Sequence, residues 1–213
     1  MHRIFLHELR LVLREPRFWI PFLVPPMFLV AMQSVALWQY GAKGQVVDPN
    51  LLLVVGALLS TMSVTLTSDS FAGERERNTL ELLLSLPIGL PSLFWGKLLA
   101  LLPLPLALSS LSLILLWKIS GLDGIYLIKT LFYSISVCLV VTGISLLISL
   151  FAKTVRSAAQ TNVLFVLVVL VATQLAAPWY FSCGWASLVL FPCALLAFAT
   201  LSWLGLRRFG RMN

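Results

Sequence analysis

The sequence predicts an all-α, polytopic membrane protein with six transmembrane helices, an N-terminal interfacial amphipathic helix and a cytoplasmic helix between the second and third spans. Of the 213 residues, 60% are hydrophobic and 11% are charged, against roughly 25% charged in an ordinary soluble domain. The apolar residues form long runs without charge, near the roughly 20 residues with which a helix crosses a bilayer. Barrel strands would instead alternate over about ten residues, so helices are predicted.

Six runs are each long enough to cross the membrane once, within a single transmembrane domain of residues 1–213. They cover residues 18–40, 51–67, 98–117, 130–152, 161–177 and 185–205. A cleaved signal peptide is the competing interpretation of the first run, because Ser34-Val35-Ala36 resembles a small-residue cleavage site. Cleavage would leave five spans. The amphipathic pattern of the preceding residues favours a retained span.

The distribution of positive charge predicts the orientation. Only Lys43, Lys118 and Lys129 fall on one side of the six-span arrangement, and the other twelve of the fifteen Lys and Arg residues fall on the opposite side. By the positive-inside rule, both termini are therefore expected in the cytoplasm, with the chain in the cytoplasmic (inner) membrane. The net charge of +7 does not indicate nucleic-acid binding, because no basic cluster with interleaved aromatics lies in a segment able to fold in water.

Residues 1–15 predict an amphipathic helix that lies in the cytoplasmic interface. Its basic and apolar side chains occupy opposite faces, and Pro16 is expected to end it before the first span. The polar face carries Arg3, His7, Arg10 and Arg14, and the apolar face carries Phe5, Leu9, Val12 and Leu13.

Residues 69–91 differ from a simple connector, because they hold four of the eight acidic residues of the chain. On a helix, Glu74, Arg77 and Glu81 would share one face, and Leu80, Leu83 and Leu84 another. Pro87 and Pro91 would end this helix before Lys97 starts the third span. A solvated connector is the simpler interpretation, but a face carrying both charge signs offers specific pairs to a protein partner.

The stretch Glu74-Arg-Glu-Arg-Asn-Thr-Leu-Glu-Leu-Leu-Leu-Ser-Leu-Pro-Ile, followed by Trp95-Gly96-Lys97, resembles the signature of the type-2 exporter permeases of the ATP-binding-cassette (ABC) class. The resemblance implies a coupling helix over about 70–86 that docks on a separate ATPase. It also implies two ATPase copies holding ATP and Mg, and a second permease copy or homologue as dimer partner. Asn78 stands where the family usually has Gly, and Asn also tolerates a left-handed backbone. The ATPase-coupling residues implied are Glu74, Arg75, Glu76, Arg77, Asn78, Thr79 and Glu81.

The chain lacks the residues of several enzyme and carrier mechanisms. It has no Gly-x4-Gly-Lys-Ser/Thr loop, so we expect it to be a transporter subunit and not an enzyme, with ATP hydrolysed by a partner chain. Its two histidines, His2 and His7, lie outside the six runs, and the runs contain no charged residue. A Ser-His hydrolase, haem ligation in the membrane and ion-coupled carriage are therefore disfavoured. We expect no cofactor or metal on this chain.

Hydroxyl side chains within the spans are the candidate lining of a weakly polar pathway, which would favour lipidic or amphipathic cargo from the membrane. Close helix packing is the alternative, because small residues four apart also pack helices together. Pro103 and Pro105 are expected to bend the third span. The candidate pathway residues are Ser60, Ser63, Thr67, Ser109 and Ser112.

The predicted function is a permease subunit of an ABC exporter. A haem-exporter-type permease of cytochrome c maturation and a non-transport scaffold or assembly protein are the alternatives. For the outer loop 178–184, the resemblance suggests short re-entrant helices, and a plain tight turn is the alternative. Reversing Glu74 and Glu81 to Lys is expected to uncouple the ATPase. Cys138, Cys183 and Cys193 lack metal-ligand spacing and are interpreted as packing residues.

Overall fold

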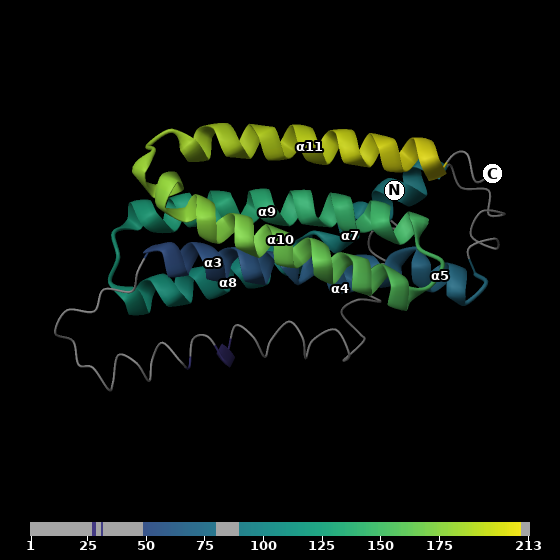
Figure 1. Ribbon diagram of the computed structural model, residues 1–213, viewed down its shortest axis with the longest axis horizontal. Coiled ribbons are helices and arrows are strands. Elements are labelled where there is room, and N and C mark those ends of the chain that lie inside the picture. Colours follow the sequence, from purple (N-terminus) through teal and green to yellow (C-terminus); the bar gives the residue numbers. More distant parts are fainter. Residues whose placement is uncertain (1–26, 29–30, 32–48, 80–89, 210–213) are drawn as a thin grey trace.

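The computed structural model describes residues 27, 28, 31, 49–79 and 90–209, and all regular secondary structure in this part of the chain is helical (Figure 1). Within it, five helical stretches are long and apolar enough to cross a membrane: Pro49–Glu76, Phe94–Ser120, Gly124–Phe151, Val155–Ser182 and Ala186–Arg208. They match the last five of the six predicted spans. Apart from Met27, Phe28 and Ala31, the predicted first span and the interfacial helix with Arg3, His7, Arg10 and Arg14 lie outside the described residues.

The first described span consists of three consecutive helices, α3 (Pro49–Thr61), α4 (Ser63–Ser70) and α5 (Ala72–Glu76). Hydroxyl groups in this span bond to carbonyls three or four residues earlier, for example Thr61 to Leu58 at 2.7 Å and Ser68 to Val64 at 2.7 Å. Such bonds draw backbone carbonyls away from the helix ladder and favour bends. The interruptions at Met62 and Phe71 fit this composition.

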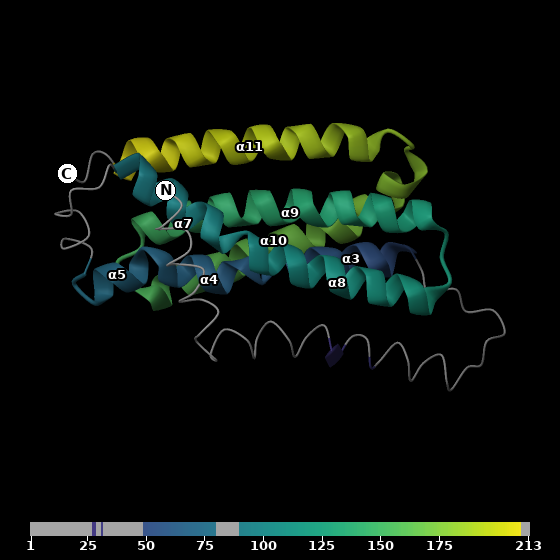
Figure 2. The same cartoon turned by 180° about the vertical axis from the view of Figure 1, so that it is seen from behind.

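The second described span is divided at Leu102 into α7 (Leu90–Leu101) and α8 (Pro103–Ser120), and Figure 2 shows the change of direction between them. Pro103 begins α8, where its missing N–H costs no helical bond. The predicted bend at the proline pair is therefore confirmed. At its other end α8 stops at Gly121, whose φ of 68° is the left-handed conformation that glycine adopts without steric cost.

Helix α9 (Gly124–Phe151) lies at the centre and contacts α3, α4, α8, α10 (Val155–Ser182) and α11 (Ala186–Phe209). A polar seam joins it to the first described span. The hydroxyl oxygens of Ser60 and Ser134 are 2.7 Å apart. Closer to the charged end, the hydroxyl groups of Thr67 and Ser145 are bonded to each other. Small hydroxyl residues let these helices approach closely while their polar groups stay satisfied.

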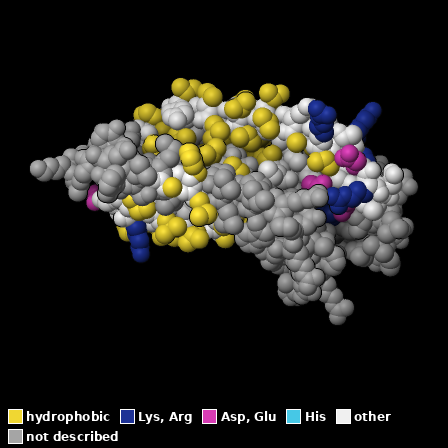
Figure 3. Space-filling view, turned by 90° about the horizontal axis from the view of Figure 1, so that it is seen from below, with side chains coloured by type: hydrophobic (Ala, Val, Ile, Leu, Met, Phe, Trp, Pro, Cys, Tyr) yellow, Lys and Arg dark blue, Asp and Glu magenta, His cyan; other side chains and the backbone are white. Residues whose placement is uncertain are grey.

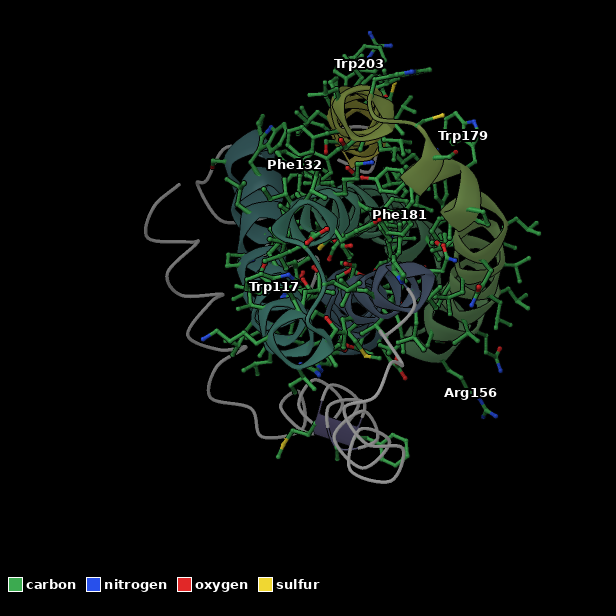
Figure 4. All side chains as sticks on the ribbon, turned by 90° about the vertical axis from the view of Figure 1, so that its left-hand side faces the viewer. Trp117, Phe132, Arg156, Trp179, Phe181 and Trp203 are labelled. Atoms are coloured by element: carbon green, nitrogen blue, oxygen red, sulfur yellow. The ribbon has the colours of Figure 1, made fainter. Side chains whose placement is uncertain are left out.

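The two ends of the bundle differ in chemistry. Figure 3 shows charged side chains gathered at one end beyond a hydrophobic band. This charged end holds seven of the nine described Lys and Arg residues, and Lys118 and Lys129 lie at the other. The opposite, aromatic end carries tryptophan and tyrosine side chains, such as Trp117, whose ring N–H bonds to the Leu122 carbonyl at 2.7 Å, and Trp179 against Trp185 (Figure 4). Aromatic belts of this kind occur where a membrane meets water.

The coupling helix and the outer loop 178–184 differ from what the family resemblance suggests. A single helix over about 70–86 is not present, because residues 70–76 finish the preceding span and α5 ends at Glu76. Residues 80–86, including Glu81, lie outside the described residues. The outer loop 178–184 contains no separate re-entrant helix, since α10 continues through Pro178 to Ser182 and a short turn leads to α11 at Ala186.

Candidate functional site

The described charged residues of the signature sequence meet Asp69 at the charged end, where α5, the start of the second described span and the connection from α9 to α10 come together (Figure 1). We call these six residues the charged junction. Three are acidic and three are basic, so the junction is formally neutral. Its members are Asp69, Glu74, Arg75, Glu76, Arg77 and Lys97.

Glu74 and Lys97 form an ion pair inside the junction. The Lys97 ammonium donates a hydrogen bond to Glu74 Oε1, and their side chains are only 4% and 17% exposed respectively. The ammonium also lies 5.5 Å from the centre of the Phe71 ring, which itself stacks on Phe94. A charge in so apolar a setting requires a partner. Glu74 therefore faces the interior and ties α5 to α7.

Arg75 and Glu76 bind the ends of two other helices. The Arg75 guanidinium donates to the carbonyls of Ala152 at 2.6 Å and Leu150 at 3.1 Å, where α9 ends. The Val155 N–H, at the start of α10, donates to Glu76 Oε2 at 3.1 Å. Helix ends leave carbonyls and N–H groups without helical partners, and a cation at a C-terminus and an anion at an N-terminus are both favourable.

The end of α5 is a Schellman turn. Asn78 has φ 57°, its N–H bonds to the Arg75 carbonyl at 3.2 Å, and the Thr79 N–H bonds to the Glu74 carbonyl at 2.9 Å. This pair of bonds closes a helix around a left-handed residue, a position usually taken by glycine. The expectation that Asn78 replaces a family glycine in a left-handed turn agrees with this geometry.

Residues 77–79, which we call the exposed turn, project from the junction into solvent. Arg77 is 67% exposed and lies 3.5 Å from Asp69, which is 31% exposed. Between this pair and α10 is a hollow of about 320 Å³, lined by Asp69, Gly73, Glu76, Arg77 and Val155. The close approach of the Asp69 side chain favours glycine at position 73, because a Cβ there would fall 2.2 Å from Asp69 Oδ1.

The structure thus separates the implied ATPase-coupling residues into two groups. Glu74 and Arg75 are partly buried and engaged within the chain, whereas Glu76, Arg77, Asn78 and Thr79 are exposed. The expectation that Glu74 lies on an outward face is wrong, because its carboxylate is directed toward Lys97. A Glu74→Lys substitution would place a second lysine beside a buried one, and its effect would not report on a partner.

The five candidate pathway residues are buried in helix seams of this single chain. Ser60 and Thr67 bond to α9, and Ser109 and Ser112 bond to carbonyls of their own helix at 3.2 and 2.8 Å. Ser63 is also fully buried. In this conformation their positions agree with the helix-packing alternative.

Sequence reasoning missed three participants. From the sequence, Lys97 is expected to start the third span and to end the family signature, with no partner named, although a lone lysine so close to apolar sequence signals a buried partner. Ser149 accepts the N–H groups of Phe71 and Ala72 at 3.2 and 3.0 Å and so supports the bend between α4 and α5. Asn162, fully buried in α10, donates to Ser68 Oγ at 2.8 Å. No sequence pattern identifies these two partners.

Comparison with known families agrees with this architecture. Residues 3–174 match the family model described as ABC-2 type transporter, which accounts for most of the 213 residues. No curated protein matches the chain. The matched region includes the charged junction, three of the five described spans in full and most of the fourth, Val155–Ser182. The chain therefore belongs to the ABC-2 type transporter family of membrane permeases and is a multi-pass membrane protein.

Proposed function

We propose that this chain is the permease subunit of an ATP-driven exporter whose ATP is hydrolysed by a separate subunit. The observation that carries the proposal is the exposed turn, a short surface closed by two backbone hydrogen bonds beside six charges that are mostly paired within the chain. A surface held by an internal network is suited to receiving force from a partner, because little of the applied movement is absorbed locally. Family membership supports the same assignment.

In this proposal two ATPase subunits, with their ATP and Mg, dock at the charged ends of two permease copies. The charged end faces the cytoplasm of the inner membrane, in keeping with the excess of basic residues there. A second copy would also cover part of the apolar surface of α10 and α11, where Leu175 and Leu188 are 78% and 75% exposed. The cargo proposed is lipidic or amphipathic, because the apolar runs of the spans carry hydroxyl groups and no charged side chain, a composition that favours such cargo over ions.

Purification of the complex tests this function. The chain alone, reconstituted in lipid nanodiscs, should hydrolyse no ATP above the background of an empty-nanodisc control. Co-expressed with its ATPase subunit, it should purify as a complex with equal numbers of both chains, as measured by native mass spectrometry. A chain that hydrolyses ATP by itself, or that purifies without any ATPase subunit under mild detergent, would contradict the proposal.

A further inference from the structure

The contacts of Arg75 and Glu76 enclose one short connection. Only Ala152, Lys153 and Thr154 lie between the last residue of α9 and the first of α10. Arg75 holds the α9 side of this connection through two carbonyls, and Glu76 holds the α10 side through one N–H group. Neighbouring residues of α5 thus bind both sides of the same connection.

Two further sets of contacts join α9 to α10 away from the charged end. In the half of α9 nearer the aromatic end, the Tyr133 hydroxyl lies 2.8 Å from the Thr173 hydroxyl. Near the aromatic end the Tyr180 hydroxyl donates to the Lys129 carbonyl at 2.8 Å, and the Lys129 ammonium donates to the Phe181 carbonyl at 3.2 Å. Because the Tyr133 and Tyr180 rings also pack together, with their centroids 5.2 Å apart, these contacts form one cluster. With the contacts at the charged end, α9 and α10 are therefore connected near both ends, which favours movement as a pair.

We propose that Arg75 and Glu76 are positioning residues that make the end of α5 and the α9–α10 connection move as one unit. An ATPase subunit docked on the exposed turn would then displace α9 and α10 together and carry the displacement to the aromatic end. This inference rests on the proposed function. It assigns Arg75 and Glu76 a role inside the permease, in place of direct contact with the ATPase.

The chemistry of the two side chains supports this assignment. The planar guanidinium of Arg75 spans two carbonyls, which a lysine ammonium could not reproduce with the same geometry. Glu76 needs only an acceptor oxygen to keep the Val155 N–H satisfied. Arg75→Lys should therefore weaken the link, and Glu76→Gln should largely retain it. Arg77, in the same segment, pairs with Asp69 and serves as the matched control.

Distance measurements between spin labels test the link directly. Labels at Thr79→Cys and Lys153→Cys, both exposed positions, are introduced after replacement of the three native cysteines by Ser. Pulsed electron paramagnetic resonance in nanodiscs should give a narrow distance distribution within the otherwise unaltered chain. Arg75→Ala or Glu76→Ala should broaden it, Arg75→Lys should broaden it less, and Glu76→Gln and Arg77→Ala should leave it narrow.

The second measurement follows transmission in the complex with the ATPase subunit. Each of the two permease copies carries one Lys153→Cys label. The distance between these two labels should change when ATP and vanadate trap the complex. In Arg75→Ala this change should be lost while the corresponding change between Thr79→Cys labels persists. A change at position 153 that survives in Arg75→Ala and Glu76→Ala would overturn the inference.

The two measurements distinguish failure of the inference from failure of the proposed function. The distribution between positions 79 and 153 within one chain requires no ATPase. If it stays narrow in both alanine variants, the positioning role is wrong, whatever the complex does. If the wild-type complex shows no nucleotide-dependent change at either position, the ATP-driven function is wrong, and transmission through Arg75 and Glu76 falls with it.

Discussion

The Lys97 ammonium donates a hydrogen bond to the Glu74 carboxylate beside the Phe71 ring, and this pair joins α5 to α7 from inside the bundle. Because Lys97 is 4% exposed and Glu74 17% exposed, removing one partner leaves the other charge poorly solvated. We expect Lys97→Met to destabilise the protein by about 3 kcal/mol, near the lower end for broken buried pairs because Glu74 keeps some contact with solvent.

The double variant Glu74→Gln with Lys97→Met should regain most of that loss, since both charges are gone. Thermal unfolding of the purified protein, followed by tryptophan fluorescence, measures both effects. Lys118→Met at the opposite end is the control, and it should change stability by no more than about 0.5 kcal/mol. A single Lys97→Met variant as stable as this control would show that the pair is unimportant for stability.

Ser149→Ala should loosen the bend between α4 and α5. The Ser149 hydroxyl accepts two backbone N–H groups and donates to the Ser68 carbonyl at 3.2 Å. Without it, buried backbone groups lose a partner, at a cost of about 1–3 kcal/mol. Hydrogen exchange at the Phe71 and Ala72 amides should accelerate. Ser182→Ala, where the exposed hydroxyl bonds only within its own helix, should leave exchange at these two amides unchanged.

Asn78 should tolerate replacement by Gly but not by Ala. Its φ of 57° costs an ordinary L-residue roughly 1–2 kcal/mol, which glycine avoids. Asn78→Ala should therefore lower the melting temperature and speed exchange of the Thr79 amide, which bonds to the Glu74 carbonyl. Thr79→Ala keeps the backbone bonds and is the control. Equal stability of the Gly and Ala variants would mean that the turn does not require this conformation.

Apolar run length predicted the described spans well, because the hydrocarbon thickness of a bilayer constrains a helix more tightly than side-chain packing does. The runs 98–117 and 130–152 correspond to helical stretches at Phe94–Ser120 and Gly124–Phe151. The proline pair likewise predicted the break at Leu102, since proline geometry acts locally. Each of these signals is contained in a continuous stretch of sequence.

The site was harder to predict because its contacts join residues far apart in the chain. Helical spacing placed Glu74 and Arg77 on one outward face, but that argument assumed a continuous helix through residue 86. The left-handed Asn78 ends the helix, and Glu74 turns toward Lys97, 23 positions later. The bonds from Arg75 to the end of α9 span more than 70 residues. No local pattern encodes such pairings.

The orientation of the charged end remains a prediction from the positive-inside rule. Cysteine substitutions at Lys153 and Asp123 place one reporter at each end of α9, in exposed positions. With the three native cysteines replaced by Ser, a membrane-impermeant maleimide applied to intact cells should label Asp123→Cys and leave Lys153→Cys unlabelled. Permeabilised cells supply the control in which both react. The opposite labelling pattern would reverse the proposed topology.

The last prediction concerns Arg77, which we expect to contact the ATPase subunit through its outward guanidinium. Arg77→Asp should reduce co-purification of the ATPase, because a like-charge contact at an interface can cost several kcal/mol. The same variant also breaks the pair with Asp69, so the substitution alone does not separate the two causes. That internal pair is largely exposed, and such pairs contribute about 0–1 kcal/mol.

A charge swap separates the loss of an ATPase contact from the loss of the internal pair with Asp69. Asp69→Arg combined with Arg77→Asp restores the internal pair in the opposite direction while keeping the outward charge reversed. If Arg77 acts only within the permease, the swap should restore co-purification. If it contacts the ATPase, binding should stay weak even though thermal stability recovers. Lys118→Glu, a reversal at the aromatic end, should leave co-purification unchanged. Full recovery in the swap would assign Arg77 to the interior network with Glu74, and the docking surface would then have to lie elsewhere.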